Sequence, residues 1–302
     1  MDMGVEIDNV DKAKKLLEHH SYYNVINGYR RPFLYHGRRH SFIRDTKFEE
    51  IFALYDFDRR LRNTLFPILL DVENTLKTEI LYEFSKTTDN EGHLLHDGDG
   101  YLKLSSYDVN GENNERKIKY TLNLIGDLQK TLTNSFQKSE SVDHYLLNYG
   151  YVPLWVLGTQ ITFGTISKFY QSMKQSNRQA ISRKYSMSDD DFLTLLKLLA
   201  LSRNYCAHYN RLYCMKSNIL LPTPNIDVYP TQHRFVTTLP NQQALFKVFI
   251  ALKYFVPKKS FKSLINVVKT SIDALGLKMK VITINDILDI MGFPSDWLTI
   301  TE

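Results

Sequence analysis

The longest regular pattern of apolar positions lies between residues 47 and 85. Apolar side chains recur there at steps of three and four residues, which is the spacing of one face of an amphipathic helix. They are Leu61, Leu65, Ile68, Leu69, Val72, Leu76 and Ile80. Two i,i+4 pairs of opposite charge, Asp58 with Arg62 and Glu73 with Lys77, are expected on the polar side of this helix. Pro67 predicts a kink or an interruption.

A second pattern predicts a helix over about 189–214. Ser188, with Asp191 three residues later, is an N-cap signal, and acids in the first turn suit the positive end of the helix dipole. The first three turns are apolar on nearly all sides, so we expect this helix at the centre of the fold. Further helices are expected over 9–27 (two short ones, the first capped by Asp11), 117–137, a short stretch after it, 165–185, 241–254, 260–275 and 285–291.

Three stretches lack helical periodicity. Pro32 blocks a helix in residues 28–44, where Gly37 separates two short aromatic runs, so a small β-hairpin or an irregular excursion is expected. Residues 86–116 are rich in Asn, Asp and Gly and are expected to form a mobile loop. Residues 216–241 hold four prolines and are also expected to form a loop.

The composition favours a helical fold, because 302 residues contain only 9 prolines and 13 glycines. A hydrophobic content of 43% and a charged content of 24% exclude a wholly disordered or collagen-like chain. We expect an all-α protein in three segments. Residues 1–46 form a small basic and aromatic element, residues 47–215 a helical domain that includes the polar loop 86–116, and residues 216–302 a loop with a basic helical extension.

The chain has features of a protein from a reducing compartment. Cys206 and Cys214 are eight residues apart without a second pair, which fits neither a zinc site nor a disulfide framework. The first residues lack the basic and apolar regions of a signal peptide, and no window approaches the roughly 18 apolar residues of a membrane span. We therefore expect a cytoplasmic protein without membrane contact. The net charge of +5 is compatible with binding nucleic acid but does not require it.

The predicted central helix becomes polar in its C-terminal half, Arg203-Asn-Tyr-Cys-Ala-His208-Tyr-Asn-Arg211. Polar groups are costly at the end of a core helix unless they are paired or functional. Asn204, His208 and Arg211 are spaced to share a helical face, and the long Arg203 side chain can reach the imidazole. A buried polar network that closes the helix end is the structural alternative to a catalytic pair. The same Arg-x4-His spacing occurs once more, in a segment whose proline forbids a helix.

Arg203-Asn-x-x-Ala-His208 at the end of an apolar helix resembles the HEPN superfamily of ribonucleases. The chain is similar to the abortive-infection family of AbiD and AbiF type, which protects bacteria against phage. The resemblance runs in the expected order through Tyr22–Phe33, Phe48–Arg62, Val72–Thr78, Tyr149–Val156, Thr162–Thr165 and Arg203–Leu212. After Arg211 the family commonly has an aromatic residue followed by Asn, and here Leu212-Tyr-Cys214 stands instead.

The resemblance implies a HEPN-type helical bundle and a homodimer in which two Arg-x4-His helices meet at one composite site. It implies metal-independent RNA cleavage without a cofactor, with Arg203 and His208 as the catalytic pair. An imidazole, whose ordinary pKa is about 6.5, can take the proton of a ribose 2′-OH that then attacks the adjacent phosphate. A guanidinium stabilises the charge of the transition state. The partner subunit's His208 would protonate the leaving 5′-oxygen.

Supporting roles are expected for three further residues. Asn204 would orient the imidazole or the phosphate. Arg211 would contact the substrate or hold an acid from the long helix, with Glu73 as a candidate. Hydrogen bonding on a helix face is the alternative for Asn204 and Arg211. No acidic cluster with metal-ligand spacing lies near the motif, so no metal site is expected.

Two basic regions are candidates for RNA contact. The first spans residues 28–44, where five arginines occur without an acid and aromatic residues between them offer base stacking. The arginines are Arg30, Arg31, Arg38, Arg39 and Arg44, and the aromatic residues are Tyr29, Phe33, Tyr35 and Phe42. The second is a lysine-rich tail that includes Lys258, Lys259 and Lys262. A solvated surface is the ordinary meaning of such charge runs.

The sequence therefore predicts an antiphage abortive-infection protein that acts as an endoribonuclease. The alternative is a non-cleaving RNA-binding protein that holds a structured small noncoding RNA, because some family members resembling this chain are associated with such RNAs. A protein-only toxin–antitoxin partner without nuclease activity is disfavoured, because Arg203 and His208 are both present.

Overall fold

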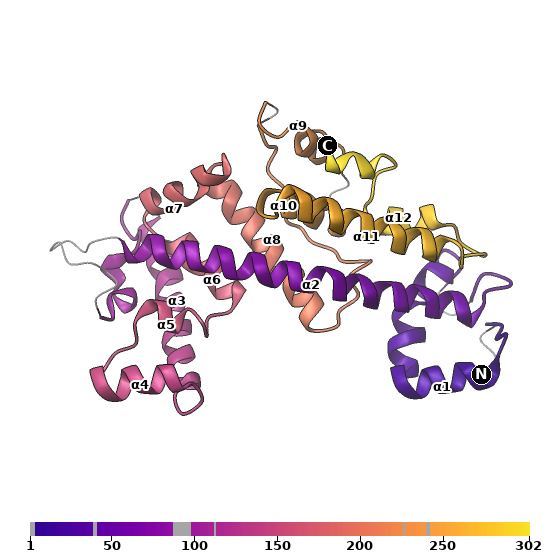
Figure 1. The fold of residues 1–302 in the computed structure, drawn as a ribbon, viewed down its shortest axis with the longest axis horizontal. Coiled ribbons are helices and arrows are strands. Elements are labelled where there is room, and N and C mark those ends of the chain that lie inside the picture. The colour runs from indigo at the N-terminus through magenta and orange to yellow at the C-terminus, as the bar shows by residue number, and fades with distance from the viewer. Residues whose placement is uncertain (1–3, 39–40, 87–97, 112, 226, 240–241) are drawn as a thin grey trace. The chain divides into compact units, whose positions relative to one another are not determined.

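The computed structural model is built from helices and describes residues 4–38, 41–86, 98–111, 113–225, 227–239 and 242–302 (Figure 1). The α-helices are α1 (Val10–His20), α2 (Phe48–Ser85), α3 (Asn114–Ser135), α4 (Glu140–Tyr149), α5 (Leu154–Leu157), α6 (Phe163–Ser172), α7 (Gln175–Ser182), α8 (Asp189–Ala207), α9 (Pro230–Thr238), α10 (Leu245–Phe255), α11 (Lys258–Gly276) and α12 (Ile284–Met291). Within these residues β-structure is limited to isolated bridges, which confirms the all-α class. None of the helices in the described ranges has both the length and the apolar character needed to cross a bilayer.

The N-terminal element is a series of tight turns. A π-helical turn at Tyr23–Asn27 is followed by a 3-10 turn at Arg31–Phe33. One antiparallel bridge then joins Leu34 to Phe42. The predicted hairpin is therefore not confirmed, since a single bridge is all the pairing that the described residues of this segment show.

Two compact units make up the chain. One contains residues 1–69 and 202–302, and the other contains residues 70–201. Helices α2 and α8 each begin in one unit and end in the other. The N-terminal and C-terminal parts of the chain therefore belong to the same compact unit. The three predicted segments, by contrast, were defined by changes in composition along the sequence.

Helix α2 is the predicted long helix, and it continues through Pro67 without interruption. Its predicted apolar stripe is buried at Leu61, Leu65, Leu69, Val72, Leu76 and Ile80. A proline has no N–H to donate to the carbonyl four residues earlier, which is that of Asn63. Pro67 and Asn63 are both exposed, so water can satisfy that carbonyl and the helix does not have to break.

Three of the four residues in the two charged pairs of α2 are buried and Lys77 is half-buried, so the predicted place of these pairs on the polar side of the helix is wrong. Asp58 is fully buried and Arg62 nearly so. Glu73 is 3% exposed, and the Lys77 ammonium lies 3.5 Å from its carboxylate. Lys77 also donates to the Ile161 carbonyl at 2.8 Å. Buried charges of this kind require partners, and each pair supplies them within one helical turn.

The unit of residues 70–201 has an aromatic core. The Phe84 ring lies 4.8 Å from that of Phe169 and 5.4 Å from that of Tyr107. Tyr101 and Tyr107 are buried, and both belong to residues 98–111 of the predicted loop 86–116. This part is therefore anchored in the core instead of forming a mobile loop. Residues 87–97 and 112 lie outside the described residues.

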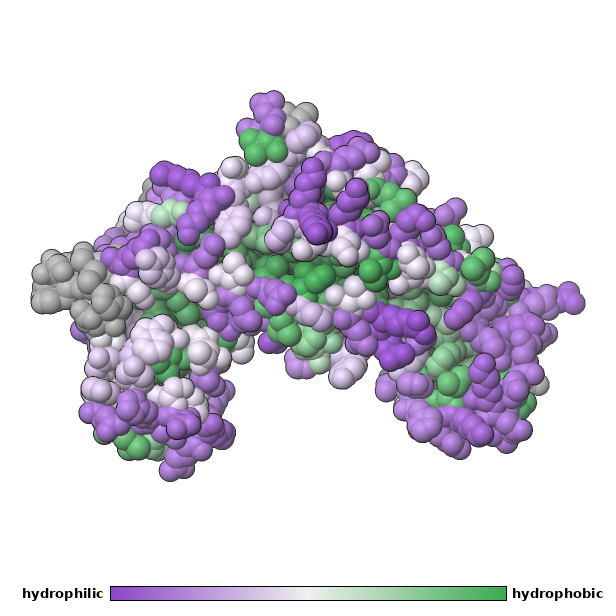
Figure 2. Space-filling view, in the orientation of Figure 1, coloured by the Kyte–Doolittle hydropathy of each residue, from purple (hydrophilic) through white to green (hydrophobic). Residues whose placement is uncertain are grey.

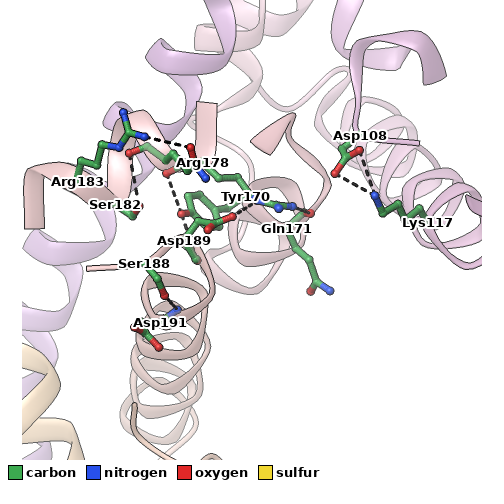
Figure 3. A network of polar contacts seen from close by, with 11 residues as sticks. Asp108, Lys117, Tyr170, Gln171, Arg178, Ser182, Arg183, Ser188, Asp189 and Asp191 are labelled. Atoms are coloured by element: carbon green, nitrogen blue, oxygen red, sulfur yellow. Dashed lines mark hydrogen bonds and ion pairs between the residues drawn. The ribbon is translucent and has the colours of Figure 1, made fainter. Parts of the chain in front are cut away.

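Polar contacts fix the start of α8 (Figure 3). The hydroxyl of Ser188 accepts the backbone N–H of Asp191 at 3.1 Å, which confirms the predicted N-cap. Arg178 donates to the Asp189 carboxylate at 3.0 Å and to the Gln171 carbonyl at 3.0 Å. Because Gln171 lies in the last turn of α6, this bond satisfies a carbonyl that the helix itself leaves unpaired. The helix predicted over 165–185 is thus divided into α6 and α7.

The C-terminal helices form the apolar core of the other unit. Helix α10 is buried along most of its length, with α11 beside it and the C-terminus near α9 (Figure 1). The rings of Phe246 and Phe249 lie 4.9 Å and 5.5 Å from that of Phe293, which in turn lies 5.1 Å from Trp297. Helix α9 occupies part of the predicted loop 216–241. At the other end of the chain, Asn9 caps α1 in place of the predicted Asp11.

Candidate active site

Helix α8 ends just before His208, in the hydrogen-bond pattern of a Schellman motif. The N–H of Asn210 donates to the Tyr205 carbonyl at 3.0 Å, and the N–H of Tyr209 donates to the Cys206 carbonyl at 3.4 Å. Tyr209 takes the left-handed position of the motif, with φ of 55°. A helix cannot continue through a left-handed residue, so the chain turns away here.

The turn separates residues that the sequence predicts on one helical face. Asn204 lies within α8, His208 caps its end, and Arg211 lies three residues beyond the cap. The Arg211 guanidinium donates to the Gly28 carbonyl at 2.8 Å, which ties the turn to the N-terminal element. Arg211 therefore leaves the predicted face, and its side chain meets the turn that contains Gly28. His208 keeps its helical spacing from Asn204, because its N–H donates to the Asn204 carbonyl at 3.0 Å.

A buried carboxylate on α2 holds the chain that follows α8. The Asp58 carboxylate accepts the backbone N–H of Tyr213 at 2.7 Å and that of Leu212 at 3.2 Å. It also accepts the Tyr29 hydroxyl at 2.6 Å and forms an ion pair with Arg62. Two backbone groups, a hydroxyl and a guanidinium thus converge on one carboxylate. This arrangement fixes the segment after His208 to α2.

The protonation of this cluster follows from its burial. Desolvation raises the pKa of Asp58, and the Arg62 charge and the donated hydrogen bonds oppose that rise. Burial also raises the pKa of the Tyr29 hydroxyl, and the neighbouring Asp58 charge adds to the rise, so Tyr29 is a hydrogen-bond donor at neutral pH. Arg62 donates in addition to the Asn210 carbonyl at 3.2 Å. The cluster therefore positions both sides of the turn.

A polar cavity of about 540 Å³ opens beside the turn. It is lined by Tyr23, Asn24, Asn27, Gly28, Tyr29, Tyr55, Arg62, His208, Tyr209, Asn210 and Arg211. His208 is exposed, and its imidazole forms no hydrogen bond with any residue that the structure describes. Both ring nitrogens are thus available to a ligand in the cavity. The guanidinium of Arg211 contributes a permanent positive charge to the same space.

Arg203 lies outside the lining of this cavity. It is half-buried on α8, and its Nη1 donates to the Asn204 side-chain oxygen at 3.4 Å. Within one chain the structure therefore brings His208 together with Arg211 at the cavity. It does not place Arg203 there.

Glu73, the predicted candidate partner of Arg211, forms an ion pair with Lys77, four residues further along α2. The acid of α2 that serves the turn after α8 is Asp58. Across the described ranges, no cluster of three His, Cys, Asp or Glu side chains offers a metal-binding set.

The first basic region is exposed at its arginines but not at most of its aromatic residues. Arg31, Arg38 and Arg44 are exposed and Arg30 is half-buried, whereas Arg39 lies outside the described residues. Of the predicted stacking residues, Tyr29, Phe33 and Phe42 are buried, and Tyr35 is 45% exposed. Tyr29 and the two phenylalanines pack in the core, so the predicted stacking role is left to Tyr35.

The second basic region forms the first turns of α11. Lys258, Lys259 and Lys262 are exposed there, and the first turn contains no acid. Their charges add to the positive end of the helix dipole, which lowers the stability of the helix and favours the binding of an anion there.

In the space-filling view, the surface over α1 is largely hydrophilic (Figure 2).

Residues 15–214, which are 200 of the 302 residues, match the family model of Abi-like proteins. The chain belongs to this family. The match contains every residue of the cavity, from Tyr23 to Arg211, and both partners of the Asp58–Arg62 pair. Membership confirms the predicted relation to abortive-infection proteins. Neither a curated protein nor a solved structure matches the chain.

Sequence reasoning missed several residues of the site in this Abi-like protein. The i,i+4 spacing of Asp58 and Arg62 predicts that they form an ion pair, but nothing in the neighbouring sequence indicates that the pair is buried. For Asn24 and Asn27 the sequence gives no indication of a role, except that they lie in a stretch that resembles the family. Tyr209 follows the motif histidine directly, yet its left-handed conformation depends on how the chain leaves α8.

Proposed function

We propose that this Abi-like protein is a metal-independent endoribonuclease that acts in abortive infection against phage. The observation that supports it most directly is the exposed His208 imidazole, which has no hydrogen-bond partner among the described residues and lies with Arg211 at a polar cavity. A general base must be accessible and must have a free ring nitrogen, and His208 meets both conditions.

The reaction needs a base, an acid and stabilisation of negative charge. His208 takes the proton of a ribose 2′-OH, and the 2′-oxygen forms a bond to the adjacent phosphorus while the bond to the 5′-oxygen breaks. The leaving 5′-oxygen takes a proton from the partner subunit's His208, which acts in its protonated form. The products are a 2′,3′-cyclic phosphate and a 5′-hydroxyl. Arg211 offers charged donors to the phosphate oxygens from the cavity.

Arg203 enters this proposal through a homodimer. It lies on the last turns of α8 and outside the cavity of its own chain. A two-fold axis beside the ends of the two α8 helices would bring each Arg203 to a site formed with the partner. Asn204, on the same turn, would then contact the phosphate or orient Arg203. Its side-chain oxygen already accepts a hydrogen bond from the Arg203 guanidinium at 3.4 Å.

The test compares two histidine variants of the purified protein on RNA. His208→Ala should reduce cleavage by at least about 100-fold, the lower range for loss of a general base. His36→Ala is the matched control, because His36 is exposed and belongs to the other Arg-x4-His spacing, beginning at Arg31. It should cleave like the unmodified protein. Equal cleavage by both variants would refute the catalytic role of His208.

The metal and nucleophile requirements are tested on the same substrate. Cleavage should persist in EDTA, should leave a 2′,3′-cyclic phosphate, and should stop when the scissile nucleotide carries 2′-deoxyribose. Activity that EDTA abolishes and magnesium restores contradicts the proposal. Protection against phage should be lost with His208→Ala and kept with His36→Ala.

The second candidate function is the binding of a structured small RNA without cleavage. The exposed charges of Arg31, Arg38 and Arg44, and of the lysines in the first turns of α11, favour it. Replacing the three arginines by Ala should weaken RNA binding and lower the salt dependence of log K by roughly 0.7–0.9 for each phosphate that is no longer neutralised. Phage protection that needs these arginines but not His208 supports binding over cleavage. Sequencing of RNA that co-purifies with the protein would identify the bound species and its ends.

A further inference from the structure

We infer that the cavity beside His208 binds one unpaired nucleobase of the RNA strand, stacked on Tyr209 and edged by Asn24 and Asn27. The inference builds on the proposed RNA substrate and adds the part of the strand that the protein recognises. It assigns a single-stranded substrate, because a base within a duplex cannot enter a cavity.

Tyr209 is held in an unfavourable conformation with its ring in solvent. The residue occupies the left-handed position of a helix-ending motif, where glycine is usual, and it is 80% exposed. A tyrosine exposed in this way adds nothing to the stability of the folded protein, and its left-handed backbone conformation lowers that stability. Strained residues of this kind cluster at functional sites, because the surrounding structure must impose them. Here the Asp58 cluster imposes it by fixing the chain after Tyr209.

Another part of the cavity lining comes from a π-helical turn, Tyr23–Asn27. π-helical turns are rare in proteins overall, and those that occur are often found at functional sites. Tyr23 is 72% exposed, and the side-chain amides of Asn24 and Asn27 have no hydrogen-bond partner among the described residues. An amide offers both donors and an acceptor, which is what the edge of a nucleobase requires.

The dimensions and charge of the cavity fit the same ligand. Its volume of about 540 Å³ is in the range of small-ligand pockets, which suits a base with its ribose. Arg211 supplies a positive charge for the neighbouring phosphate, while Arg62 is neutralised by Asp58. Aromatic platforms next to a positive charge are the common device for binding single strands.

Fluorescence of a short 2′-O-methyl oligoribonucleotide that carries one 2-aminopurine tests the inference. The strand is unpaired and cannot be cleaved through its 2′-oxygen, so binding is measured without catalysis. The protein should quench the 2-aminopurine as the base stacks. Tyr209→Gly should weaken binding roughly tenfold or more and remove the quenching, because stacking on one aromatic side chain contributes that much. Tyr209→Phe should keep both.

Two controls exclude an effect on folding or on general surface properties. Glycine suits the left-handed position, so Tyr209→Gly should melt at the same temperature as the unmodified protein or higher. Tyr22→Ala removes a 47% exposed tyrosine that is adjacent in sequence but outside the cavity lining, and should leave binding unchanged. Equal affinity and equal fluorescence for the unmodified protein and Tyr209→Gly would overturn the inference, and a peptide partner would then be the better candidate for this cavity.

The outcome separates this inference from the proposed ribonuclease activity. Quenching that depends on Tyr209, in a protein that cleaves no RNA, supports the base site and contradicts the endoribonuclease. Cleavage of single-stranded RNA that requires His208 but is the same in Tyr209→Gly supports the endoribonuclease and contradicts the base site.

Discussion

Asp58 illustrates how one residue fixes the geometry of a site to which it contributes no chemistry. Its carboxylate, fully buried on α2, binds the backbone N–H groups of Leu212 and Tyr213 and pairs with Arg62. Arg62 in turn donates to the Asn210 carbonyl. These contacts join residues about 150 positions apart in the sequence. Asp58 is therefore a positioning residue for the turn that carries His208.

Removal of the carboxylate should be strongly destabilising. Asp58→Ala leaves Arg62 as a buried charge without its partner and two backbone N–H groups without an acceptor, and should lower the free energy of unfolding by about 3–5 kcal/mol. Urea denaturation measures this. Asp56→Ala is the matched control, since Asp56 is two residues earlier and pairs with the half-buried Arg59 and the exposed Arg60. Its cost should stay within about 1 kcal/mol.

A second variant keeps the test informative if Asp58→Ala does not fold. Asp58→Asn preserves the shape and one acceptor oxygen, so a smaller loss is expected. Cleavage by a folded Asp58→Asn protein should fall through displacement of the turn after His208. Equal stability of the Asp56 and Asp58 variants would show that the buried cluster does not hold the site.

At the scale of elements, α8 is fixed at both of its ends by different means. Its start is fixed by the Ser188 cap and by the Arg178–Asp189 pair, and its end by the Schellman motif around Tyr209. Each end satisfies backbone groups that the helix leaves unpaired. The position of His208 therefore depends on where α8 ends.

The cap at the start of α8 gives a prediction for a single hydroxyl. Ser188→Ala should lower stability by about 1 kcal/mol, because the Asp191 N–H loses its acceptor. Ser139 precedes α4 in the same way but makes no capping hydrogen bond, so Ser139→Ala should cost clearly less. Thermal melting of the two variants under identical conditions measures the difference. A larger loss for Ser139→Ala would contradict the assignment of the cap.

At the scale of the whole molecule, the proposed chemistry requires two chains. One chain places a single imidazole at its cavity, and Arg203 lies outside that cavity. A two-fold dimer makes each interface patch face its own copy, so the two α8 ends can meet. The composite site would then hold both imidazoles that the reaction uses.

Sedimentation should give a particle of twice the 35.3 kDa chain mass. In a heterodimer of unmodified protein with His208→Ala, the composite site is missing one of its two imidazoles, so cleavage should fall far below half. A differently tagged pair, purified through both tags, allows this measurement. A fully active monomer, or a heterodimer with half the activity, would show that each chain acts alone.

The sequence by itself determined the helical class and most of the elements, because helical periodicity, caps and scarce breakers are local properties. The apolar stripe of α2, the cap at Ser188 and the apolar character of α8 were all visible in neighbouring residues. The motif with Arg203 and His208 was also visible, since its spacing is short. In each case the residues that matter lie within a few positions of one another.

The tertiary structure alone decided which charged and aromatic side chains are buried. Asp58 and Arg62 have the spacing of an exposed pair, and Phe33 and Phe42 lie among arginines, yet all four are buried. The cavity that contains His208 depends on a turn near residue 25 and another near residue 209. Burial and such distant contacts depend on how remote segments pack, and the free energy of that packing is not encoded in any local pattern.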